Sequence, residues 1–253
     1  MDNFTKLYRF RSLFGMGISK DESIRIWGKM YRSDVGKEKR SIFVDRKKKI
    51  AKENLSVLLL GKLVKFIGIS GSVASGFAKK DDDIDVFVVV RDGTMWLYRA
   101  LVQIRNISQG RIRRKREKSV KDKFCLNLIA EERGLTFDCD IFNLNELMYL
   151  IPIYNEKYVN YIYSQNQWLV EEYSVKKDCL ITNIKPQKQA NMFFRILNKL
   201  LYCFQLAYMK IANHQPDIER LERNSKKGRI EFFSKKFNEK KIENYLKEFK
   251  SIS

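Results

Sequence analysis

The residues with the clearest chemical potential lie between positions 66 and 90, in the segment FIGISGSVASGFAKKDDDIDVFVVV. Asp83 and Asp85 occupy alternate positions at the start of an apolar, β-branched run, Ile84 to Val90, which predicts a buried strand. Side chains alternate between the faces of a strand, so the two carboxylates should project together, roughly 6–7 Å apart along the backbone. Buried carboxylates without partners are costly, and a hard divalent cation such as Mg²⁺ or Mn²⁺ would compensate them.

Gly71 and Ser72 form a second candidate group, about ten residues before the aspartates. The apolar run over residues 63–69 predicts a strand that ends at this pair, and a short helix should begin near Val73. Backbone N–H groups at the start of a helix attract phosphate oxygens, glycine allows close approach of the backbone, and serine adds a hydroxyl donor. The two groups together have the composition of a site that holds and orients phosphates by charge stabilisation.

Helices should flank this strand–turn–helix–strand unit. Ser19 and Glu22 have the spacing of a capping box, which predicts a helix that starts there and runs toward Tyr31. A second helix is expected over about residues 45–61. After the turn that follows the aspartate strand, Thr94 is expected to cap a helix that ends near Ile107.

Further strands and helices follow downstream. A strand is expected over residues 124–130 and a helix over residues 143–151, which should stop near Pro152. From about residue 155 the pattern is helical, with a long amphipathic helix whose aromatic stripe near Phe193 is expected to lie in the core. The chain divides into three predicted segments: a basic helical segment over 1–44, a core over 45–155, and a basic helical C-terminal region over 156–253.

The combination of Gly71-Ser72, a gap through Asp82, and Asp83-Ile84-Asp85 in an apolar strand resembles the polymerase-beta-like nucleotidyltransferase superfamily. The stretches GSVASGFAKKDDDIDVFVVVRDGTMWLYRALV, KDKFCLNLIA and DIFNLNELMYLIPIYN are similar to a poorly characterised prokaryotic group within it, over about residues 45–175. The resemblance implies an α/β (α+β) fold with a mixed sheet and a helical C-terminal region.

The same resemblance implies a site and an activity. Gly71 and Ser72 would bind the phosphates of a nucleoside triphosphate such as ATP, and Asp83 and Asp85 would be catalytic residues that hold Mg²⁺ or Mn²⁺. The enzyme would move a nucleoside monophosphate to an acceptor, either RNA, a protein or a small molecule.

The superfamily usually has a third carboxylate, on a neighbouring antiparallel strand, which often acts as general base. In the strand over residues 124–130 the inward polar position is Asn127, which cannot act as a base, and Asp138 is the alternative. Asp140 is expected to cap the next helix. A missing third acid favours a second hypothesis, a catalytically weak or inactive module that binds nucleotide or RNA.

The formal net charge of +20 favours polyanionic partners such as RNA or a nucleotide, although a general lysine bias would give the same charge. Val73 stands where many small relatives carry arginine, so a triphosphate contact is expected from Lys79, Lys80 or the basic cluster over residues 111–123. Alternatively, these side chains form a solvated surface.

Four cysteines without a C-x-x-C pair, and one histidine, exclude a zinc set and predict buried free thiols in a reducing cytoplasm. The most apolar stretch, about residues 200–209, is shorter than the roughly 20 residues that a membrane span needs. A third hypothesis places residues 188–210 and the lysine-rich tail on a membrane surface; it ranks below the other two because these apolar residues are expected to pack on the domain. The sequence does not specify the base preference or the oligomeric state.

Overall fold

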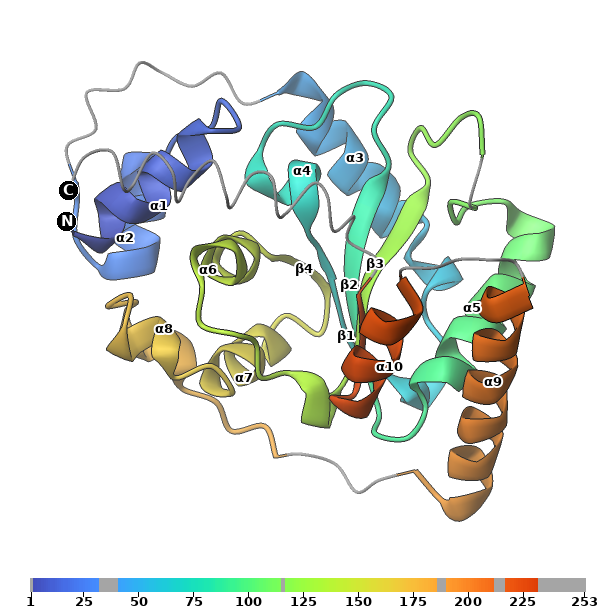
Figure 1. Ribbon diagram of the computed structural model, residues 1–253. Coiled ribbons are helices and arrows are strands. Elements are labelled where there is room, and N and C mark those ends of the chain that lie inside the picture. Colours follow the sequence, from blue (N-terminus) through green and yellow to red (C-terminus); the bar gives the residue numbers. More distant parts are fainter. Residues whose placement is uncertain (1, 32–40, 115–116, 186–189, 212–216, 232–253) are drawn as a thin grey trace.

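A five-stranded mixed sheet forms the centre of the protein in the computed structural model, which describes residues 2–31, 41–114, 117–185, 190–211 and 217–231 (Figure 1). The strand order is β4–β1–β2–β3–β5. β1 pairs antiparallel with β2 and β4, whereas β3 pairs parallel with β2 and antiparallel with β5. The strands are β1 Val64–Ile69, β2 Ile84–Val90, β3 Phe124–Glu131, β4 Ile151–Tyr154 and β5 Arg229–Glu231.

Helices cover both faces of the sheet, which gives three layers (Figure 1). The first face carries α1 Asn3–Ser12, α2 Lys20–Trp27, α6 Ile141–Met148, α7 Tyr158–Ser164 and α8 Trp168–Glu171. The second face carries α3 Ile42–Glu53, α5 Met95–Gln109 and α9 Met192–Ile211, with α10 Asp217–Lys226 beside β5. The short helix α4 Gly71–Ser75 follows β1 directly.

Strand alternation decides which residues face which layer. Phe66 of β1 and Phe87 of β2 belong to the core on the first face, while Ile67 and Val86 belong to the core on the second. Asp85 is two residues before Phe87 and therefore lies on the first face, the one that α6 covers.

Several sequence predictions are confirmed. Ser19 forms a capping box with Glu22 at the start of α2, with both reciprocal hydrogen bonds present. β2 has the predicted bounds, and the Asp140 side chain accepts from the backbone N–H of Asn143 at the start of α6. The mixed sheet and the α+β class are as expected.

Two helix starts differ from prediction. Thr94 stands at the N-cap of α5, but its hydroxyl donates to the carbonyl of Arg91 instead of capping. Asn198 of α9 takes over this role, because its Oδ1 accepts from two backbone N–H groups in the first turn of α5, at 2.7 and 3.1 Å. A side chain about 100 residues away thus supplies the cap. α3 also starts earlier than expected and ends at Glu53, before two short 3₁₀ turns, Leu55–Val57 and Gly61–Leu63.

The sheet holds more strands than the sequence indicated. α6 ends before Pro152 as expected, but Pro152 then lies within β4, which is possible because β4 is an edge strand. β5 was also missed, in a region predicted to be helical. The strand β3 runs parallel to β2, so the expectation that the third site position lies on an antiparallel neighbour is wrong.

The outer face of α9 and the four cysteines correct two predictions about burial. Phe193 is 69% exposed, and neighbouring apolar residues of α9 are exposed with it, so this stripe is not part of the core. None of the four cysteines is fully buried: Cys125 and Cys179 are half-buried, and Cys139 and Cys203 are exposed. Among the described residues, no helix combines the length and the apolar character that crossing a bilayer requires.

Candidate metal and nucleotide site

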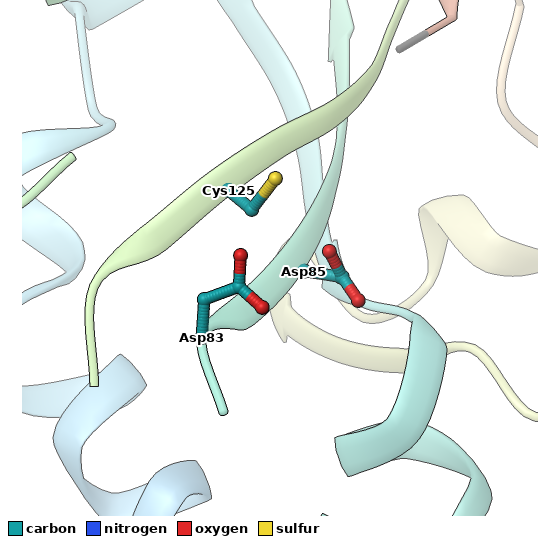
Figure 2. A group of neighbouring side chains, drawn as sticks. All are labelled: Asp83, Asp85 and Cys125. Carbon is teal, nitrogen blue, oxygen red and sulfur yellow. The ribbon is translucent and has the colours of Figure 1, made fainter. Parts of the chain in front are cut away.

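Asp83 and Asp85 lie together where β2 begins. Asp83 immediately precedes the strand and Asp85 is its second residue, and both side chains are half-buried. Cys125 of β3 joins them, and the potential ligand atoms of the three side chains lie within 4.8 Å of one another (Figure 2). In the described part of the chain, this is the cluster of acidic and thiol side chains close enough to share one metal ion.

A buried lysine fixes the loop that delivers Asp83. The ammonium group of Lys47, on α3, donates to the carbonyl of Asp82 at 2.6 Å and to the carboxylate of Asp122 at 2.8 Å. The backbone N–H of Asp122 also donates to the Asp82 carbonyl, and that of Ile84 donates to the Lys123 carbonyl. The loops before β2 and β3 are therefore tied to each other at the base of the site.

Gly71 makes direct contact with Asp85. The backbone of Gly71 has φ +63°, in the left-handed region that favours glycine, and a Cβ added there would lie 2.2 Å from the Oδ2 atom of Asp85. The backbone N–H of Ser70 also donates to the Asp85 carbonyl at 2.9 Å. Only glycine fits at position 71, and the corner after β1 lies against the acidic pair.

Ser72 is held by the neighbouring loop. Its hydroxyl donates to the Oδ2 atom of Asp82 at 3.3 Å, and the same oxygen accepts from the backbone N–H of Lys79 at 2.8 Å. The Ser72 hydroxyl must turn away from Asp82 before it can bind a phosphate oxygen. Val73 is buried in the core on the second face of the sheet and offers no contact to a ligand.

The two aspartates have different electrostatic environments. Burial, followed by the charges of Asp83 and Glu146, raises the pKa of Asp85 to about 7. Asp83 instead forms an ion pair of 2.7 Å with the guanidinium group of Arg113. Asp85 therefore has an excess of negative neighbours, which a bound cation would relieve.

Asn127 and Cys125 complete the wall that β3 contributes. Asn127 Nδ2 donates to Asp85 Oδ1 at 2.5 Å, and the Cys125 thiol donates to Asn127 Oδ1 at 3.5 Å. Burial raises the pKa of Cys125, so its sulfur stays protonated and is a poor metal ligand. The oxygen atoms of the two aspartates suit Mg²⁺ or Mn²⁺, and the donor set therefore fits a hard cation.

Neither predicted position supplies a third acid to this cluster. Asn127 occupies the inward position on β3, as the sequence indicated. Asp138 is not part of the cluster: its side chain is 73% exposed and lies 3.8 Å from Lys227 and 3.9 Å from Arg229.

Glu146 on α6 is an acidic neighbour of the site that the sequence analysis did not identify. Its carboxylate accepts from the backbone N–H of Gly71, and its charge contributes to the raised pKa of Asp85. Burial raises the pKa of Glu146 itself to about 7. The only sequence signal was one acidic residue inside the otherwise uncharged stretch of α6, which has no fixed spacing from the aspartates.

A cavity of about 200 Å³ adjoins this group between α6 and the sheet. Ser70 and Glu146 line the end that borders the candidate site. The rest of the lining is of two kinds: Phe87, Leu128, Phe137, Phe142, Leu147 and Leu150 are apolar, and Asp138, Asp140, Asn143, Arg220, Arg229 and Glu231 are polar or charged.

The basic cluster over residues 111–123 has one direct link to the site, the ion pair of Arg113 with Asp83. Lys123 pairs with Glu117, and positions 115–116 lie outside the described residues. Lys79 and Lys80 are exposed. Of the candidates for a phosphate contact that the structure describes, Arg113 is therefore the one whose charged group contacts the aspartate pair.

Comparison with models of protein families shows which family the chain belongs to. The model of the nucleotidyltransferase domain family matches residues 44–203, more than half of the 253 residues, and spans β1, β2, β3 and the candidate site. Comparisons with curated proteins and with solved structures found no match. The fold, the glycine–serine corner and the extent of the family match agree, and the chain belongs to the nucleotidyltransferase domain family of the polymerase-beta-like superfamily.

Proposed function

We propose that the protein is a metal-dependent nucleotidyltransferase that transfers a nucleoside monophosphate from a nucleoside triphosphate to an acceptor. Asp83 and Asp85 hold Mg²⁺ or Mn²⁺, and Gly71 and Ser72 bind the phosphates. The observation that supports this assignment best is the contact between Gly71 and Asp85, because it joins a phosphate-binding corner to a carboxylate whose negative neighbours outweigh the positive charge of Arg113.

In the proposed reaction, a nucleophilic oxygen or nitrogen of the acceptor forms a bond to the α-phosphorus of the triphosphate. The bond from that phosphorus to the bridging oxygen breaks, pyrophosphate leaves, and the acceptor loses one proton. A bound divalent cation supplies charge neutralisation and orientation of the phosphates. The protein's own contribution is the fixed placement of Asp83 and Asp85 by the Lys47-bound loop, which costs no rearrangement during the reaction.

Glu146 is proposed to supply the proton acceptor that Asn127 cannot. It lies beside Asp85 and has a pKa near 7, which suits a general base at neutral pH. In the structure its carboxylate accepts from the backbone N–H of Gly71, which a phosphate oxygen would also use as a donor. Binding of the triphosphate at Gly71 would free the Glu146 carboxylate to accept the proton of the acceptor.

The cavity beside Glu146 is proposed to receive an organic part of a substrate. Its lining includes the apolar rings of Phe87 and Phe142 together with several polar side chains, such as that of Asn143. Pockets of this composition hold a ring or chain by apolar contact and orient it through a few polar groups. An acceptor seated there would lie next to Glu146, as the proposed proton transfer requires.

A labelling assay tests the activity. The full chain is incubated with each nucleoside triphosphate labelled at the α-phosphate, with Mg²⁺, and with cellular RNA and lysate proteins as acceptors. Label should move to an acceptor, and Asp83→Asn combined with Asp85→Asn should abolish the transfer. Asp81→Asn is the matched control, because Asp81 belongs to the same acidic run but is 80% exposed. Equal labelling by the double variant and the control would refute the assignment.

A second candidate function is a nucleotide-binding or RNA-binding module with weak or no turnover. The presence of Asn127 at the third position favours it, because an amide cannot accept the acceptor's proton. Under this function, the triphosphate should bind without any transfer of label. RNA binding that needs no nucleotide and survives the double aspartate variant would also favour it over the enzyme.

A further inference from the structure

The outer side of α9 is a continuous apolar surface, defined here as the α9 apolar face. Figure 1 shows this helix along the outer edge of the molecule. Exposed large apolar side chains recur every three or four residues from Phe193 to the end of the helix, and Met192 is exposed beside them: Phe193, Ile196, Leu200, Phe204, Tyr208 and Ile211. Phe204 is 74% exposed and Ile211 is 86% exposed. Contiguous exposed apolar surface of this kind marks an interaction site.

The orientation of α9 is fixed by its opposite side. Leu201 and Leu206 pack against the core on the second face of the sheet. The ring of Tyr202 lies 5.3 Å from that of Trp96, and Asn198 caps α5. The α9 apolar face is therefore held toward the outside by specific contacts, and rotation of the helix would break them.

Within α9 itself, every charged residue is positive. α9 contains no aspartate or glutamate, and its charged residues are Arg195, Lys199 and Lys210, all exposed. The whole chain carries a formal charge of +20. A second copy docked on this face would bring like charges together, whereas an acidic surface would complement them.

The width of the α9 apolar face also indicates which kind of partner it fits. Besides the large side chains, Cys203 and Ala207 are exposed, so neighbouring positions on the helix join the stripe into a broad band. A coiled-coil partner needs only a narrow seam of positions a and d. A broad apolar band with lysine and arginine beside it, about 30 Å long for 20 residues, is typical of a helix that lies in a membrane interface.

We infer that the α9 apolar face binds the surface of an anionic lipid bilayer. The apolar side chains enter the boundary between headgroups and acyl chains, and Arg195, Lys199 and Lys210 contact anionic headgroups. The helix lies along the surface and does not span it. Membrane binding by residues 188–210 was the third hypothesis from the sequence, and it ranked lowest because these residues were expected to pack on the domain. Membrane binding by the α9 apolar face does not depend on the transferase activity.

Vesicle flotation of the full chain tests the inference. Vesicles of phosphatidylcholine alone are compared with vesicles of phosphatidylcholine mixed with phosphatidylglycerol. The protein should float with the mixed vesicles and much less with the neutral ones. Ile196→Ser combined with Phe204→Ser should weaken binding to the mixed vesicles at least about tenfold, the effect of losing about 1.4 kcal/mol. Lys199→Gln combined with Lys210→Gln should weaken it as well.

Ile42→Ser is the matched control, because Ile42 is 82% exposed on α3, away from this helix. It should bind mixed vesicles like the unchanged protein. Melting temperatures of all variants check that each remains folded. Three results would overturn the inference: no flotation with mixed vesicles, flotation that the apolar variant leaves unchanged, or self-association that the apolar variant abolishes in the absence of lipid. The last would assign the face to a second copy of the chain.

Discussion

Replacing Asp85 by asparagine should stabilise the metal-free protein while it removes the activity. In the folded chain the pKa of Asp85 is about 7, against an ordinary value of 3.8. Because the pKa is raised in the folded state, the folded protein favours the protonated form of Asp85. The resulting contribution to the free energy of unfolding is fully present below about pH 3.8 and is lost as the pH rises to 7. Each pKa unit corresponds to about 1.4 kcal/mol, so ionised Asp85 costs the folded state up to about 4 kcal/mol at pH 8.

Asparagine has nearly the same shape as aspartate, carries no charge, and keeps an oxygen that can accept from Asn127. Asp85→Asn should therefore raise the melting temperature at pH 8 in the presence of a chelator. For a chain of this size, 1 kcal/mol corresponds to roughly 2–4 °C. The gain should be less than half as large at pH 5, where Asp85 is already protonated in the folded state.

Thermal unfolding at pH 5 and pH 8, with and without Mg²⁺, measures these effects. Mg²⁺ should raise the melting temperature of the unchanged protein at pH 8, because it binds the folded state, and should have little effect on Asp85→Asn. Asp81→Asn, at an exposed position of the same acidic run, should show neither change. If Asp85→Asn lowered the melting temperature at pH 8, or raised it equally at both pH values, the raised pKa would be wrong. If Mg²⁺ raised the melting temperature of Asp85→Asn as much as that of the unchanged protein, the proposed metal role would be wrong.

Three further substitutions test the scaffold and the proposed roles. Gly71→Ala should abolish labelling and should destabilise the protein more than Gly110→Ala. Both glycines have φ near +60°, but a Cβ added at Gly110 meets no atom within 4 Å. The difference between the melting temperatures of the two variants therefore measures the effect of the collision with Asp85. Glu146→Gln should slow transfer of label by about a hundredfold or more while the Mg²⁺-induced rise in melting temperature persists; unchanged transfer would exclude Glu146 as the base. Lys47→Met should lower the free energy of unfolding, measured with denaturant, by about 3–5 kcal/mol, because it leaves Asp122 without its buried partner. Lys49→Met, at a position that is 78% exposed, should be close to neutral. Equal effects of the two substitutions would show that the Lys47 contacts do not hold the loop.

Local sequence was sufficient for the central part of the site. The run from Ile84 to Val90 has a strand's composition and no competing pattern, and its bounds were correct. The alternation of a strand then puts Asp83 and Asp85 on one side without any information from the rest of the chain. Caps that lie within a few residues of their helix, such as Ser19 and Asp140, were also predictable, because donor and acceptor are close in sequence.

Features that depend on distant segments were decided only in the tertiary structure. The cap of α5 comes from Asn198, and the parallel pairing of β3 with β2 depends on the path of the chain between them. Glu146 reaches Gly71 only because α6 packs over the end of the sheet, and no sequence spacing encodes that approach. Periodicity showed that α9 is amphipathic, but it could not show which side is buried. In the structure the side with Leu201 and Leu206 packs on the core, and a broad apolar band remains exposed on the other side.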